Sequence, residues 1–205
     1  AGQCAAPDKL AAAAGDLPVV ADSCHALGTA YGSGGRVGDC RHAIMETFSF
    51  HPVKIIAAGE GGAVITNDGE LAQRLRRLRN HGMTRDTDSF IRDDLACDGK
   101  GEPNPWYYEM AELGLNCRLS DIHCALGLSQ LGKLDTFCAV RRALAARYDE
   151  KLAPLAPLVR PLSRVADCDP AWHLYVARID FTALGIERAA VMAQLTEAGI
   201  GTQVH

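Results

Sequence analysis

The sequence lacks any apolar run near the roughly 18 residues that a membrane-spanning helix needs, so we expect no membrane span. Its first ten residues contain no basic start followed by an apolar core, and no initiator Met is present. The formal net charge of -4 gives no overall attraction to nucleic acid or to an acidic membrane. We therefore expect a cytoplasmic protein, and we interpret the abrupt ends at Ala1 and His205 as those of a fragment without either terminus of its parent.

The eight cysteines contain no C-x-x-C pair and no paired cysteine–histidine ligand block. That spacing argues against a zinc site, so we expect no metal. Cysteine often behaves as a small buried hydrophobe, and unpaired thiols are typical of a reducing compartment. We predict free thiols.

What the sequence does have is an alternation of short apolar runs with helical patterns, which indicates an α/β fold. Three prolines in residues 153–161 are typical of a linker, so we predict a larger domain at 1–152 and part of a smaller one at 153–205. The expected strands are 17–21, 43–50, 63–66, 172–179 and 200–204. The expected helices are 8–15, one capped by Asn67 or Asp68, one capped by Ser120 that pauses near Asp135 and continues to about 152, and 187–198.

Three motifs carry candidate chemistry. Residues 19–28 place Asp22 at the end of a strand, residues 48–54 end in Lys54 and precede a Gly-Glu-Gly-Gly turn, and residues 113–122 read Leu-Gly-Leu-Asn-Cys-Arg-Leu-Ser-Asp-Ile. An acid at the carboxyl end of a strand lies where open α/β sheets bind ligands. Pyridoxal phosphate (PLP) needs a lysine for a Schiff base, an acid at the pyridine nitrogen and hydroxyl groups for its phosphate. Lys54, Asp22 and Ser49 supply these groups.

These motifs resemble those of the DegT-type nucleotide-sugar aminotransferases, a PLP family of fold type I, over nearly the whole chain. Ser-Phe-His-Pro-Val-Lys, Gly-Glu-Gly-Gly and the Trp-Tyr-Tyr-Glu-Met string at 106–110 are most similar to the branch that makes the pseudaminic acid precursor. The resemblance implies an aspartate aminotransferase-like fold. Such a fold has a mostly parallel sheet with helices on both faces and a smaller α+β C-terminal domain.

The resemblance also implies roles for individual residues. Lys54 would carry the cofactor and move the proton during transamination, and Asp22 would pair with the pyridine nitrogen. His25 would lie beside the ring or its hydroxyl, and Ser49 would bind the phosphate.

Asn116 and Arg118 would reach the cofactor phosphate of a neighbouring subunit, which implies a homodimer with shared active sites. The implied reaction moves an amino group from L-glutamate to the C4 keto group of a UDP-linked 4-keto-6-deoxy sugar. The chain departs from the family at Ser23-Cys24, Cys117 and His123-Cys124, which bears on sugar preference.

Other interpretations remain open. His25 taken alone favours a structural role, whereas its motif favours contact with the cofactor, and His51 is more typical of a loop histidine that shapes its turn. The glycines at 32–38 imitate a dinucleotide fingerprint but open no helix, so we predict a hairpin turn. The arginines at 74–79 spread around a helix, which favours a solvated face over a nucleic-acid site. A non-catalytic regulatory protein of the same fold that binds PLP or a nucleotide sugar is the alternative function.

Overall fold

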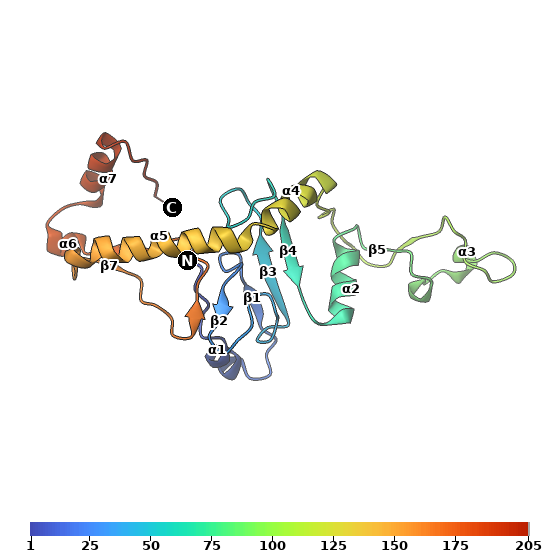
Figure 1. Cartoon of the computed structure of the whole chain (residues 1–205). Helices are drawn as coiled ribbons and strands as arrows, with labels where there is room; N and C mark the ends of the chain where they lie inside the picture. Colours follow the sequence, from blue (N-terminus) through green and yellow to red (C-terminus); the bar gives the residue numbers. More distant parts are fainter. Residues whose placement is uncertain (205) are drawn as a thin grey trace.

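The computed structural model describes residues 1–204, and a three-stranded sheet lies at its centre. Its strands are β1 (Val20–Asp22), β3 (Met45–Ser49) and β4 (Gly62–Ile65), in the order β1-β3-β4. Strand β1 runs parallel to β3, and β4 runs antiparallel to β3. Figure 1 shows the β3 and β4 arrows pointing in opposite directions.

The prediction of a mostly parallel sheet is wrong for the described residues, where the central sheet is mixed and each two-stranded sheet is antiparallel. A parallel connection needs a long crossover, whereas the chain between β3 and β4 turns straight back. Phe50 N donates to Gly61 O at 2.8 Å and closes this return. The α/β class itself is confirmed.

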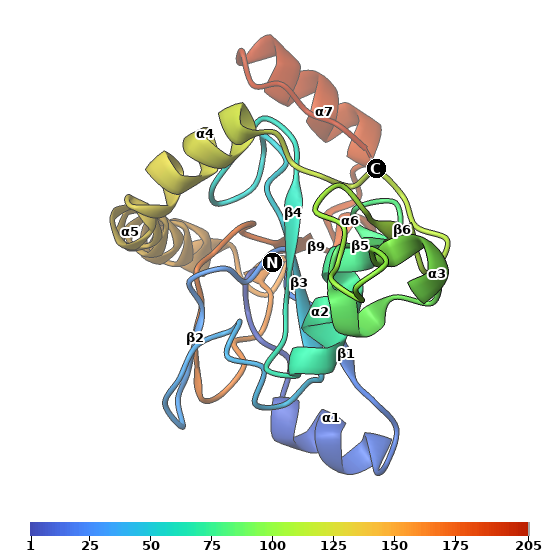
Figure 2. The ribbon, with the colours of Figure 1, turned by 90° about the vertical axis from the view of Figure 1, so that its right-hand side faces the viewer.

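Helices lie on the two sides of this sheet, as predicted. Figure 2 shows α2 (Gly69–Leu78) on one side and α4 (Asp121–Leu131) with α5 (Leu134–Leu152) on the other. Val64 lines the space beside α2 but not the one beside α4, whereas Ile65 lines both. These two spaces measure about 940 and 650 Å³, so the helices cover the sheet loosely.

Local capping signals set the helix boundaries. Asp68 accepts a hydrogen bond from Leu71 N at 3.0 Å, and Ser120 accepts one from His123 N at 3.4 Å. The predicted pause separates α4 from α5. The first helix, α1 (Pro7–Ala14), ends at Gly15, whose φ of 57° favours glycine.

The apolar run at residues 17–21 is typical of a strand buried on both faces, and this expectation is wrong. Val20 is 55% exposed, because β1 has only β3 beside it in the described sheet. The buried core is small and consists of two clusters. One contains Cys4, Ala26, Val37 and Phe48, and the other contains Ile55, Cys138 and Ala171.

A long segment leaves the body after α2, and Figure 1 shows it extending to one side. Residues 84–105 of this segment are polar, charged and interrupted by Gly and Pro, which is typical of a loop. The segment carries only short elements: β5 (Met83–Thr84), η1 (Thr87–Ser89), α3 (Asp93–Ala96) and β6 (Glu109–Met110). Within residues 1–204, no helix combines the length and apolar character that crossing a bilayer requires.

The chain after α5 returns to the body. Its elements are η2 (Ala153–Leu155), β7 (Val159–Pro161), β8 (Cys168–Asp169), β9 (Ala177–Ile179), α6 (Phe181–Leu184) and α7 (Arg188–Glu197). Strand β8 pairs with β2 (Ala30–Tyr31), while β7 pairs with β9. The domain division at 153 stays a prediction, and His205 lies outside the described residues.

Two strand predictions in this part fail. Of 172–179, only β9 is a strand, and residues 200–204 contain no strand over the described part. A strand needs a hydrogen-bonded neighbour, and the apolar pattern alone does not provide one.

Candidate active site

The ends of two neighbouring parallel strands bring the first two predicted site residues to one edge of the sheet. Asp22 ends β1 and Ser49 ends β3, and Asp22 lies opposite Thr47, two residues before Ser49. Lys54 follows in the turn after Ser49, where its backbone N–H donates to His51 O at 2.9 Å. The Lys54 side chain is half-buried. The acid, the hydroxyl and the amine thus belong to one region of the sheet edge.

The Asp22 carboxylate is held in its charged form. Cys24 N donates to its Oδ1 at 3.0 Å. Hydrogen bonds from Cys24 lower the pKa of Asp22, and the charges of His25 and Lys54 lower it further, against a smaller opposing effect of burial. A charged acid can hold a protonated pyridine nitrogen, so Asp22 suits its predicted role.

His25 lies close to both groups. Burial lowers its pKa first, and the positive charge of Lys54 lowers it further, while Asp22 acts in the opposite direction. The structure therefore brings Asp22, His25 and Lys54 within electrostatic reach of one another. The lowered pKa favours the uncharged form of the His25 ring at neutral pH.

The turn that carries Lys54 is shaped by His51, as predicted. Val53 N donates to His51 Nδ1 at 3.4 Å, and His51 N donates to Ser49 Oγ at the same distance. Glu60 Oε1 lies 3.9 Å from His51 Nε2 across the loop. These local contacts fix the path of the chain from the strand end to Lys54.

The glycine turn brings the third motif against the second. Gly61 has a φ of 140°, and a Cβ there would lie 2.8 Å from a Leu119 side-chain carbon. A Cβ at Gly59, where φ is 83°, would lie 2.9 Å from the His123 ring. Side chains at these positions would clash, so the glycines allow the start of α4 to approach the loop.

Asn116 and Arg118 lie elsewhere. Arg118 Nη1 donates to Asn80 Oδ1, and Asn116 pairs with Asn80 in an isolated β-bridge after α2. Both predicted site residues are exposed. Within residues 1–204, no hydrogen bond or ion pair joins them to Asp22, Ser49 or Lys54, and their role toward a neighbouring subunit stays a prediction.

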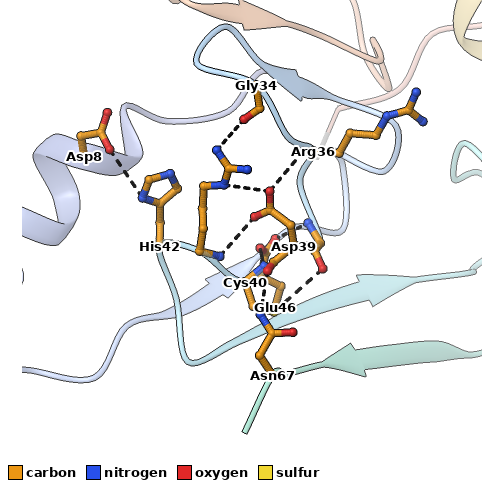
Figure 3. A network of polar contacts seen from close by, with 10 residues as sticks. Asp8, Gly34, Arg36, Asp39, Cys40, His42, Glu46 and Asn67 are labelled. Carbon is orange, nitrogen blue, oxygen red and sulfur yellow. Dashed lines mark hydrogen bonds and ion pairs between the residues drawn. The ribbon is translucent and has the colours of Figure 1, made fainter.

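Sequence reasoning missed Glu46, a buried acid of β3 that binds the residue following Asp22. Glu46 is 3% exposed and accepts a hydrogen bond from Ser23 Oγ at 2.7 Å. It also accepts from Gly38 N at 3.0 Å and from Cys40 N at 3.1 Å. Figure 3 shows this carboxylate with Cys40 within a wider polar network. A charged residue inside an apolar strand pattern was the available signal.

The same network confirms the predicted hairpin turn. Gly34 N donates to Tyr31 O at 3.0 Å, and Tyr31 N donates to Gly35 O at 3.1 Å. Asp39 accepts from Arg36 N at 3.3 Å, a contact drawn in Figure 3. No helix begins in residues 32–38, so they lack the geometry of a dinucleotide fingerprint.

The arginine-rich helix has a structural partner. Arg74 and Arg77 each donate to the Glu112 carboxylate at 3.2 Å. These ion pairs join α2 to the extended segment. The solvated face that the sequence predicts is therefore partly paired, and this pairing favours a structural role over a nucleic-acid site.

Comparison with known proteins places these features in a family. The model of the DegT/DnrJ/EryC1/StrS aminotransferase family matches residues 1–205. The chain belongs to that family. Among solved structures, Helicobacter pylori PseC, an aminotransferase involved in the biosynthesis of pseudoaminic acid, is 30% identical with a TM-score of 0.82, over 100% of this chain and 50% of that chain.

Two further solved structures are similar to the present chain. DesV of S. venezuelae, in complex with a ketimine intermediate, is 31% identical with a TM-score of 0.73 over 97% of this chain and 46% of that chain. The Spr1654 protein of Streptococcus pneumoniae, in its PLP form, is 28% identical with a TM-score of 0.72 over 92% of this chain and 44% of that chain. The chain thus spans about half the length of these structures.

Proposed function

We propose that the protein acts as a PLP-dependent nucleotide-sugar aminotransferase. The main support is that Asp22, Ser49 and Lys54 lie at one edge of the sheet. The chain also belongs to an aminotransferase family. L-Glutamate donates the amino group, and the C4 keto group of a UDP-linked 4-keto-6-deoxy sugar receives it.

The residues present fit the cofactor. Asp22 is held in its charged form, because hydrogen bonds from Cys24 lower its pKa and the charge of Lys54 adds to the effect. Lys54 is half-buried rather than fully solvated. Ser49 supplies a hydroxyl near the turn for a phosphate oxygen. When bound, PLP supplies an electron sink for the carbon that gains or loses a proton. Lys54 holds the cofactor and moves that proton, while Asp22 keeps the ring nitrogen protonated.

For the sugar, we propose the substrate of the pseudaminic acid branch. The likeness to PseC, with full coverage of this chain, supports it. So do the Ser-Phe-His-Pro-Val-Lys and Trp-Tyr-Tyr-Glu-Met strings on which the sequence prediction depends. A chromatographic assay with the C4 keto sugar and with its C3 keto isomer would separate this substrate from those of other family members.

We propose a homodimer as the working assembly. Asn116 and Arg118 are exposed, and the flanking side chains Leu113, Leu115 and Ile122 are 86%, 70% and 82% exposed. Large apolar side chains gathered in this way are typical of surfaces that another chain covers. All eight cysteines are free thiols, which supports a cytoplasmic location.

The decisive experiment is cofactor trapping. The protein is mixed with PLP, its visible spectrum is recorded, and the lysine-bound cofactor is reduced with borohydride and located by peptide mapping. The adduct is expected on Lys54, absent from Lys54→Ala and retained in Lys133→Ala, which removes an exposed lysine. PLP bound without an adduct on Lys54 would favour the non-catalytic regulatory alternative, and no binding would refute the proposal.

A further inference from the structure

Hydrogen bonds hold a short segment of the C-terminal part, residues 171–174, next to the candidate active site. Thr29, fully buried, donates its hydroxyl to Gly2 O at 2.6 Å and accepts from Ala171 N at 3.0 Å. Arg141 of α5 donates to the carbonyls of Trp172 and His173 at 3.1 and 3.2 Å. These contacts hold the backbone at His173 from two sides.

The fastened backbone places one imidazole ring on another. The rings of His173 and His25 have centroids 4.3 Å apart and are tilted by 50°. His173 is only 9% exposed, yet its Nδ1 has no hydrogen-bond partner among the described residues. A buried polar atom without a partner is costly, so the position of His173 is not explained by its own hydrogen bonding.

Burial, more than the surrounding charge, lowers the pKa of both rings. Burial lowers the pKa of His173 to about 4, and the positive charges of Lys54 and Arg141 act in the same direction. Asp22 is the negative group that acts on His25. Two neutral rings can stay packed together, whereas two charged ones would repel each other.

We propose that His173 is a positioning residue for the PLP site, where its ring holds the His25 ring in one orientation beside the cofactor. The inference rests on the proposed function, and it takes His25 to lie beside the ring or its hydroxyl, as the family resemblance implies. Because Thr29 and Arg141 hold the backbone of residues 171–173, the His173 ring has a fixed position against which the His25 ring packs. The segment after the linker thereby contributes to a site whose other residues come from residues 22–54.

The test begins without cofactor. Histidine labelled with ¹³C gives the pKa of His25 by NMR titration, with its signal assigned through His25→Asn. In wild type this pKa is expected below the ordinary value of about 6.5. His173→Ala removes the ring that packs on His25 and lets water reach His25, so its pKa is expected to rise toward that value. His173→Phe restores a ring and is expected to keep the pKa low.

His42 provides the matched control. It also has a buried ring nitrogen, Nε2, without a partner among the described residues, and it packs on Tyr31 with centroids 5.5 Å apart. His42→Ala is expected to leave the His25 titration unchanged. If His173→Ala does not fold, His173→Gln takes its place, since it keeps much of the volume but has no ring. An unchanged His25 pKa in either folded variant overturns the inference.

PLP titration then separates this inference from the proposed function. Loss of one aromatic contact is expected to weaken PLP binding roughly two- to tenfold in His173→Ala, with recovery in His173→Phe. If wild type binds PLP and His173→Ala binds it equally well, the positioning role is refuted while the proposed function stands. If wild type binds no PLP, the proposed function fails and the cofactor role of His173 with it, whereas the titration still reports the ring contact.

Discussion

Replacing Glu46 by alanine is expected to destabilise the protein strongly. The Glu46 carboxylate is buried and accepts three hydrogen bonds, from Ser23 Oγ, Gly38 N and Cys40 N. Alanine would leave three donors without an acceptor, at a site that is 3% exposed. Each donor left unpaired in this way costs about 1–3 kcal/mol. Allowing for some relaxation, the free energy of unfolding should fall by roughly 3–5 kcal/mol.

Urea unfolding followed by circular dichroism measures this loss directly. Glu46→Gln serves as the conservative variant, since its amide oxygen can still accept, but its NH₂ group would face a donor. An intermediate loss of about 2 kcal/mol is expected for it. Because Ser23 follows Asp22, amide hydrogen exchange should also accelerate in residues 23–25 of both variants.

Glu112→Gln is the matched control. Glu112 also accepts two charged hydrogen bonds, but from Arg74 and Arg77 on a partly exposed surface, where the side chain of Arg74 is 64% exposed. Surface ion pairs are typically worth about 0–1 kcal/mol, so a small change is expected. If Glu46→Ala loses no more stability than Glu112→Gln, the reasoning from buried hydrogen bonds is refuted.

Three further changes test other contacts. Thr29→Val removes a hydroxyl with two buried hydrogen bonds and should lower the free energy of unfolding by about 2–3 kcal/mol in urea unfolding. Gly82→Ala would place a Cβ 1.7 Å from Glu112 O and should lower the melting temperature clearly, whereas Gly99→Ala, with open space around it, should not. For Asp22, NMR titration should give a pKa below 3.8. Because the folded pKa is lowered, its small contribution to stability is present above about pH 4 and lost as the pH falls through the folded pKa, a difference that Asp22→Asn should abolish. A normal Asp22 pKa, or equal effects of the two glycine changes, would contradict these contacts.

Elements defined by local signals were predictable. The caps at Asp68 and Ser120 and the glycine after α1 act within a few residues, so their residue types identify the ends of helices. The Lys54 turn was equally local, because His51 bonds to residues two and three positions away. Whether a strand is buried or paired depends on distant segments. That is why β1 proved exposed and 200–204 contained no strand.

The sequence by itself determined which groups this protein has for chemistry. The order of Asp22, Ser49 and Lys54, and their positions after strands, follow from residue type and short spacing. Only the tertiary structure decided what surrounds them: Glu46 under Ser23, and His173 against His25. Such contacts join segments that are far apart along the chain and leave no periodic pattern in the sequence. They form because a buried carboxylate requires donors and a fixed backbone directs a ring, and both conditions exist only once the chain has folded.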